Sequence, residues 1–192
     1  SLKKSKYMQK PFDPWHGVNP RTDKDNVVTS LIEIPKGSKV KYEMDKDTGL
    51  IKLDRVLYSS VMYPANYGFI PQTLDGDGDP LDILVLSSHN IHSGGLLMDA
   101  IPVGGFKMID KGEADDKIVA VMVGDQVYGH IRDISELPQA EVFRLKHYFL
   151  TYKNLPYEEA TCRIDEIYGA EHAKEVIAAS QKDYSDKFGG IM

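Results

Sequence analysis

The feature that most constrains the fold is an acidic, glycine-rich segment that leads directly into a short apolar run. The segment reads Asp75-Gly76-Asp77-Gly78-Asp79-Pro80-Leu81-Asp82, and the apolar run occupies residues 83–86. A run of that length is typical of a strand and too short for a helix of its own. Glycine lets the backbone turn tightly and proline fixes its own backbone angle. The segment therefore predicts a tight loop that gathers carboxylates in front of a buried strand.

Carboxylates gathered in this way need a counterion. A pair at about 4 Å repels by about 4 kcal/mol when the effective dielectric is about 20. A hard divalent cation removes that cost, and oxygen ligands are typical of sites for Mg²⁺, Mn²⁺ or Ca²⁺. We interpret the segment as a metal site, with a solvated hairpin loop as the alternative that remains open. An EF-hand loop does not fit, because Pro80 stands where that loop requires glycine and Leu86 where it requires glutamate.

Length and composition limit the class of protein. The 192 residues suit one domain, and we expect residues 1–192 to form it, with an extended N-terminal arm at 1–26 that Trp15 anchors on the body or on a neighbouring subunit. The net charge of −6 argues against nucleic acid as a partner. No apolar run approaches the roughly 18 residues of a membrane span. The single Cys162 excludes an internal disulfide. We expect a cytoplasmic, globular protein.

Alternating apolar and polar residues predict mostly strands in the first two-thirds of the chain. Besides the run after the acidic segment, strands are expected at 27–34, 39–44, 50–56, 96–103, 104–109 and 117–123. Helices are expected from Ser135 to about Lys153 and again after Gly169. The fold class is therefore α+β and mainly β, with the short strands forming a small closed or partly closed barrel.

The hairpin expected at 39–56 carries a charge in an unusual place. Ile51, Leu53 and Arg55 have the same parity in the return strand, so they share one face. A charge on an apolar face is rarely left unpaired, which makes Arg55 a candidate functional residue. Lys41 and Glu43 share a face of the first strand, where an ordinary cross-strand pair is the favoured interpretation of these two alone.

Further short motifs follow one another along the chain. They are Glu33-Ile34-Pro35, Lys41-Tyr42-Glu43, Asp54-Arg55, Tyr63-Pro64, Asn66-Tyr67-Gly68, Asp110, Asp115-Asp116-Lys117, Asp133-Ile134, Leu137-Pro138 and Tyr152-Lys153. Together with the acidic segment, they resemble the soluble family I inorganic pyrophosphatases over about residues 27–153. The resemblance implies a five-stranded OB-like barrel with additional strands and two C-terminal helices packed on it. It also implies hydrolysis of inorganic pyrophosphate to two phosphates by a metal-activated water.

The resemblance implies a role for each matching residue. Metal ligands would be Asp77, Asp82, Asp110, Asp115 and, through bound water, Glu43. They would hold several Mg²⁺ ions, with Mn²⁺ or other divalent ions as substitutes. Phosphate oxygens would be bound by Lys41, Arg55, Tyr67, Lys117, Tyr152 and Lys153. Asp79 would orient or deprotonate the attacking water, Glu33 would be an outer-shell carboxylate, and Tyr63 would form a wall of the site. Lys111 departs from the Glu or Gln that follows Asp110 in many relatives, which bears on an outer metal.

Two other functions fit parts of the sequence. A Mg²⁺-dependent hydrolase of nucleotides or other phosphoanhydrides would use the same carboxylates, although no base-binding signature is visible. A calcium-stabilised β-barrel binding module would explain the acidic loops but not Arg55, Lys117 and the pair Tyr152-Lys153. By resemblance, a chain of this length with a short C-terminal end is expected to form a homo-oligomer, with a hexamer favoured over a dimer.

Overall fold

The computed structural model describes residues 12–22, 24–58, 60–151 and 162–189. In chain order the elements are β1 (Val28–Ile34), β2 (Val40–Met44), β3 (Ile51–Val56), β4 (Asn66–Phe69), β5 (Asp82–Leu86), β6 (Leu96–Asp110), β7 (Glu113–Ala114), β8 (Lys117–Met122), the 3₁₀ turn η1 (Ile134–Glu136), α1 (Gln139–Thr151), β9 (Cys162–Gly169) and α2 (Ala170–Phe188). Strands therefore dominate the first two-thirds, as the sequence predicts.

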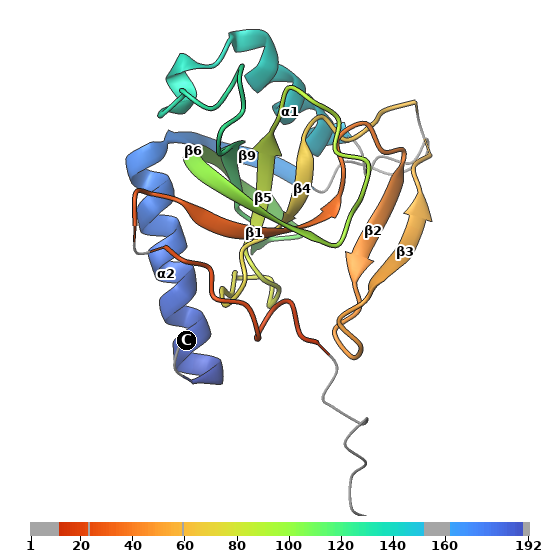
Figure 1. The fold of residues 1–192 in the computed structure, drawn as a ribbon, viewed down its shortest axis with the longest axis vertical. Helices are drawn as coiled ribbons and strands as arrows, with labels where there is room; N and C mark the ends of the chain where they lie inside the picture. Colours follow the sequence, from red (N-terminus) through yellow and green to blue (C-terminus); the bar gives the residue numbers. More distant parts are fainter. Residues whose placement is uncertain (1–11, 23, 59, 152–161, 190–192) are drawn as a thin grey trace, which may run out of the picture.

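Five strands of the described chain close into a ring. Neighbours pair in the order β1-β4-β5-β8-β6, and β6 also pairs with β1, so the sheet returns to its first strand. Only β5 and β8 are parallel among these pairs. Short β7 and long β9 extend the sheet from β6, while β2 and β3 form a separate hairpin that stands beside the barrel (Figure 1). The predicted barrel with additional strands and two helices is confirmed.

The core explains why residues 83–86 carry no polar side chain. Both faces of β5 are covered, since Leu84 and Leu86 pack in one apolar cluster with α1, while Ile83 and Val85 pack in another with α2. A strand buried on both faces needs an unbroken apolar run, and parallel pairing with β8 places it in the middle of the sheet. Asp82 is the last polar position before this run, which fixes it at the edge of the core.

One predicted strand boundary is wrong. The glycines at 104 and 105 predict two strands in 96–109, whereas β6 runs without interruption from Leu96 to Asp110. Its register against β8 shifts between Pro102 and Gly104, which is a bulge and not a strand end. The glycines allow β9 to approach β6 closely, because a Cβ atom on Gly105 would lie 2.6 Å from the ring of Tyr168 on β9. The strand β9 has no counterpart among the strands predicted from the sequence.

The first helix also begins later than predicted. Ser135 belongs to the 3₁₀ turn η1, where Asp133 caps the turn by accepting hydrogen bonds from the Ser135 backbone N–H and hydroxyl. The helix α1 starts at Gln139, directly after Pro138. The second helix, predicted after Gly169, is confirmed as α2. Within the described ranges, neither helix combines the length and the hydropathy that crossing a bilayer requires.

The N-terminal segment is anchored on the body of the protein by Trp15. The indole Nε1 donates to the Thr73 carbonyl oxygen at 2.9 Å, and the Gln72 backbone N–H donates to the Trp15 carbonyl oxygen at 2.8 Å. Trp15 also meets Phe188 near the end of α2 edge-on, with ring centroids 5.4 Å apart. Of the two expected anchoring surfaces, the body of the chain is therefore confirmed. That residues 1–192 form one domain remains a prediction.

A buried carboxylate offers a test of how the loops outside the barrel are held. Asp125 accepts hydrogen bonds from the backbone N–H groups of Ser88, Val127 and Tyr128 and from the Ser88 hydroxyl. Asp125→Ala leaves these buried donors without an acceptor, so we expect a loss of about 2–4 kcal/mol in the free energy of unfolding by urea. Asp47→Ala, at an exposed hairpin position, is the control and should change it by less than about 0.5 kcal/mol.

The contribution of Asp125 to the free energy of unfolding should depend on pH, because the hydrogen bonds favour its ionised form. Burial raises the pKa of Asp125, but the hydrogen bonds it accepts outweigh burial and bring the pKa below its usual range. A carboxyl with a lowered pKa stabilises the fold above its unfolded pKa of about 4, and this contribution is lost as the pH falls through the folded value. The difference between wild type and Asp125→Ala should thus shrink in acid, and a constant difference would contradict the assignment.

Candidate active site

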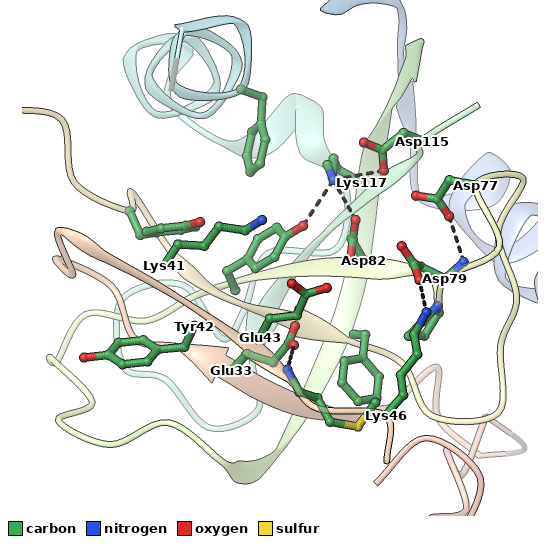
Figure 2. A pocket seen from close by; sticks show the side chains of 16 residues that line it. Glu33, Lys41, Tyr42, Glu43, Lys46, Asp77, Asp79, Asp82, Asp115 and Lys117 are labelled. Carbon is green, nitrogen blue, oxygen red and sulfur yellow. Dashed lines mark hydrogen bonds and ion pairs between the residues drawn. The ribbon is translucent and has the colours of Figure 1, made fainter. Parts of the chain in front are cut away.

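A cavity lies between the β2–β3 hairpin and the acidic loop that leads into β5 (Figure 2). Four strands of the barrel supply its floor: the end of β1, the strand β4, and the adjoining starts of β5 and β8. Its lining consists of Glu33, Lys41, Tyr42, Glu43, Met44, Lys46, Tyr63, Tyr67, Phe69, Asp77, Asp79, Pro80, Asp82, Asp115, Lys117 and Phe149. Carboxylates and lysines therefore meet in one hollow with a small number of aromatic rings.

The acidic loop is shaped by its own backbone. Gly78 has a φ of +84°, which a residue with a side chain rarely adopts, and its N–H donates to the Asp75 carbonyl oxygen at 3.0 Å. The Asp79 N–H donates to Asp77 Oδ1 at 3.0 Å, as Figure 2 shows. This turn brings carboxylates from two loops together, because oxygen atoms of Asp75, Asp77 and Asp115 all lie within 4.8 Å of one another.

Parallel strands place a lysine among the carboxylates. The register of β5 and β8 pairs Asp82 with Lys117 at the edge where both strands begin. The Lys117 ammonium donates to Asp82 Oδ2 at 2.6 Å, to Asp115 Oδ1 at 3.0 Å and to the Tyr67 hydroxyl at 3.1 Å (Figure 2). Lys117 is buried, so its charge is poorly screened and the contacts with carboxylates are strong. One ammonium nevertheless faces more than one carboxylate.

The excess of negative charge appears in the pKa values. Burial is the largest cause in each case, and it raises the pKa of Glu33 to about 8, of Asp75 to about 7 and of Asp77 to about 6. Burial also raises the pKa of Asp82, against the opposing pull of Lys117. Glu33 accepts a hydrogen bond from the Met44 N–H at 2.7 Å, which partly offsets its burial. The fold thus holds carboxyls that are costly to ionise without further positive charge.

The donor set fits a hard divalent cation. All of the grouped donors are carboxylate oxygens, which Mg²⁺, Mn²⁺ and Ca²⁺ prefer over nitrogen and sulfur. The raised pKa values have the same physical origin as metal affinity, because crowded and partly desolvated carboxylates gain most from a nearby cation. The site can therefore hold metal and, through its lysines, an anion at the same time.

Ten of the predicted site residues line this one cavity. They are Glu33, Lys41, Glu43, Tyr63, Tyr67, Asp77, Asp79, Asp82, Asp115 and Lys117. Two described candidates do not: Arg55 is exposed on β3 opposite Lys41, and Asp110 lies at the end of β6. Tyr152 and Lys153 lie outside the described residues. The roles of these residues remain predictions.

Two charged residues of the site, Asp75 and Lys46, are not among the residues predicted from the sequence. Asp75 is the first carboxylate of the acidic segment, and that position in the motif was a signal for its place in the carboxylate group. Lys46 reaches the site from the β2–β3 turn, and its ammonium lies 2.5 Å from Asp79 Oδ1. The sequence carries no signal for that contact, because it depends on how the hairpin is placed against a loop far along the chain.

Comparison with known proteins agrees with this arrangement. The family model described as inorganic pyrophosphatase matches residues 30–185. "Soluble inorganic pyrophosphatase 2" of Chlamydomonas reinhardtii is 47% identical, with 91% of this chain and 90% of that protein covered. The inorganic pyrophosphatase of Chlamydia muridarum is 40% identical, with 91% and 95% covered. The crystal structure of inorganic pyrophosphatase from Thermus thermophilus superposes with a TM-score of 0.84 at 36% identity, covering 91% of this chain and 99% of that one.

The fold, the cavity and these likenesses define an enzyme, a hydrolase that acts on a small phosphate anhydride. The chain belongs to the inorganic pyrophosphatase family, the soluble family I enzymes that hydrolyse pyrophosphate to phosphate. Members of this family use divalent metal, in keeping with the carboxylate group found here.

The raised pKa values predict how stability depends on pH and metal. Between the unfolded pKa of about 4 and the folded values, folding takes up protons, so stability falls as the pH rises. In EDTA the melting temperature should fall from pH 5 to pH 8, a range above the titration of Asp125, and excess Mg²⁺ should reverse the trend. Glu33→Gln should remove part of the decline, since its pKa is about 8. A melting temperature in EDTA that rises across this range would contradict the prediction.

Proposed function

We propose that this cavity is the site of pyrophosphate hydrolysis and that several Mg²⁺ ions are held there with the substrate. The observation that carries the proposal is the meeting of grouped carboxylate oxygens with lysines in one hollow at the start of β5 and β8. The proposed metal ligands are Asp77, Asp82, Asp110, Asp115 and, through bound water, Glu43. Mn²⁺ has similar ligand preferences and is expected to substitute.

The metal ions and the protein share the chemistry. Bound divalent cations supply charge neutralisation for the phosphates and lower the pKa of water. Asp79 lies on the loop between Asp77 and Asp82 with a half-exposed carboxylate that faces the cavity. That position suits a base that orients the attacking water and takes its proton.

Cationic and hydroxyl side chains are proposed to bind the phosphate groups. Lys41 lines the cavity from β2, with its ammonium 3.1 Å from Asp54 Oδ2, and Lys117 lines it from β8. The Lys117 ammonium donates to the Tyr67 hydroxyl oxygen, which leaves the Tyr67 O–H to donate to an oxygen of the substrate beside the positive charge. Negative charge that develops on the phosphate oxygens is stabilised by such fixed donors.

The remaining predicted roles complete the proposal. Arg55 stands opposite Lys41 on the hairpin and is proposed to bind a phosphate at the outer edge of the site. Tyr152 and Lys153 are proposed to do so from the chain that follows α1. Glu33, hydrogen-bonded to the Met44 N–H, is proposed to support the carboxylates from behind, and Tyr63 to form an aromatic wall.

We also propose a cytoplasmic homo-oligomer, a hexamer in preference to a dimer, with no nucleic-acid or membrane partner. Support for assembly comes from apolar side chains that remain exposed on and beside the hairpin, namely Leu50, Leu53, Val56 and Tyr58. Exposed apolar groups that lie close together commonly mark a surface that another chain covers. The molar mass in solution distinguishes the hexamer from the dimer.

The direct test is release of phosphate from pyrophosphate. We expect rapid release with Mg²⁺, none above background with excess EDTA, and recovery when Mg²⁺ is restored. ATP is assayed in parallel to separate a pyrophosphatase from a general phosphoanhydride hydrolase. Release from ATP at the rate seen with pyrophosphate would refute the substrate assignment, and full activity in EDTA would refute the role of metal.

The role of Asp79 predicts a specific pattern for Asp79→Asn. Asparagine fills the same volume but cannot accept a proton, so kcat should fall by about 10²–10⁴-fold while Mg²⁺ affinity stays within about tenfold. The rate should recover in part at high pH, where hydroxide replaces the missing base. Asp47→Asn, at an exposed position of the hairpin turn, should leave both quantities unchanged. A loss that excess Mg²⁺ fully restores would make Asp79 a metal ligand instead.

A further inference from the structure

Lys46 reaches into the active-site cavity from the tip of the hairpin. The tip is fixed by Asp45, whose Oδ2 accepts from the Thr48 N–H at 3.1 Å and from the Thr48 hydroxyl at 2.6 Å. From this turn the Lys46 side chain crosses to the acidic loop, where its ammonium donates to Asp79 Oδ1 (Figure 2). The hairpin and the acidic loop are thereby joined at the carboxylate that the proposed function makes the base.

The Trp15 ring also contacts the Lys46 ammonium. The ammonium lies 5.4 Å from the centre of the ring, within the range of a cation–π interaction. Trp15 is itself buried and tied to the Thr73 carbonyl oxygen, just before the acidic loop. A Cβ atom on Gly49 would lie 1.9 Å from the Phe12 carbonyl oxygen, so the N-terminal segment also packs closely on the hairpin. The ammonium therefore has a defined position at the cavity mouth.

Among the described residues that line the cavity, three are cationic, and they differ in how firmly they are held. Lys117 is 4% exposed in its side chain and contacts two carboxylates, and Lys41 is 23% exposed beside Asp54. Lys46 is 52% exposed and contacts Asp79, which is 47% exposed. An ion pair so open to solvent contributes little net free energy, so a stronger anion can take over its cation at small cost.

We propose that Lys46 is a further substrate-binding residue of this pyrophosphatase, and that its ammonium passes from Asp79 to a phosphate oxygen when pyrophosphate enters. Pyrophosphate concentrates more negative charge than a single carboxylate and arrives within the same cavity. The exchange also releases Asp79 Oδ1 from its ion pair, which leaves the carboxylate open to the attacking water. This inference rests on the proposed function, because it takes Asp79 as the base.

Substitution of Lys46 tests the exchange. Lys46→Gln removes the charge and should raise KM for pyrophosphate about five- to tenfold at saturating Mg²⁺, with kcat within about twofold, because Asp79 lacks its cation in the bound state of both enzymes. Lys46→Arg keeps the charge and should restore most of the affinity. Lys39→Gln, an exposed lysine just before β2, is the matched control and should leave KM unchanged.

Trp15 provides a signal that does not depend on turnover, because it is the only tryptophan in the chain. Methylenediphosphonate added with Mg²⁺ should change Trp15 emission in wild type and Lys46→Arg, since the cationic group leaves the ring. The change should be absent in Lys46→Gln. An unchanged KM in Lys46→Gln, or a fall in kcat without a rise in KM, would overturn the inference while wild-type activity upheld the proposed function. Wild type that does not hydrolyse pyrophosphate would refute the proposed function and this inference with it.

Discussion

A lysine buried between two aspartates is the interaction on which the site depends. The parallel pairing of β5 with β8 makes both strands begin at the same edge, so the Lys117 ammonium meets Asp82 and Asp115 directly above the apolar core. Burying charge is costly unless it is paired, and here the pairing is incomplete because the carboxylates outnumber the ammonium. The barrel therefore holds an excess of negative charge in a fixed place. An excess of negative charge favours cations, and the lysines are the groups proposed to bind phosphate.

The rest of the fold holds these charged side chains in fixed positions. Both faces of β5 are packed in apolar clusters, so Asp82 cannot move away from Lys117 without disturbing the core. The acidic loop is held by its own backbone hydrogen bonds, and the hairpin adds Lys41, Glu43 and Lys46 from the opposite side. Charge that is held in position before the substrate arrives needs no reorganisation during the reaction, which is the main source of electrostatic catalysis.

Much of the fold and of the candidate site could be predicted from the sequence, because the strongest sequence patterns are local. The acidic segment before the apolar run 83–86 correctly predicts a loop that enters a buried strand. Local signals fail where distant segments meet. Gly104 and Gly105 look like a strand end but allow close approach of Tyr168, and β9 gives no clear pattern because most of its residues are only partly buried or exposed. The contact between Lys46 and Asp79 likewise depends on the placement of the hairpin and not on spacing. The alternation of residues in the hairpin places Arg55 on one face with Ile51 and Leu53, but its side chain is exposed in the structure.

The aromatic contact between Trp15 and Phe188 lies outside residues 30–185, the part that matches the family. Segments near the two limits of the described residues therefore meet at Trp15, over whose ring the Lys46 ammonium lies. A substitution in this contact can move Trp15 and, through its ring, the lysine that lies over it. The two rings depend on each other, because a large ring lost at one position leaves a gap beside the other. Residues outside the range that matches the family can therefore influence where a lysine of the cavity lies.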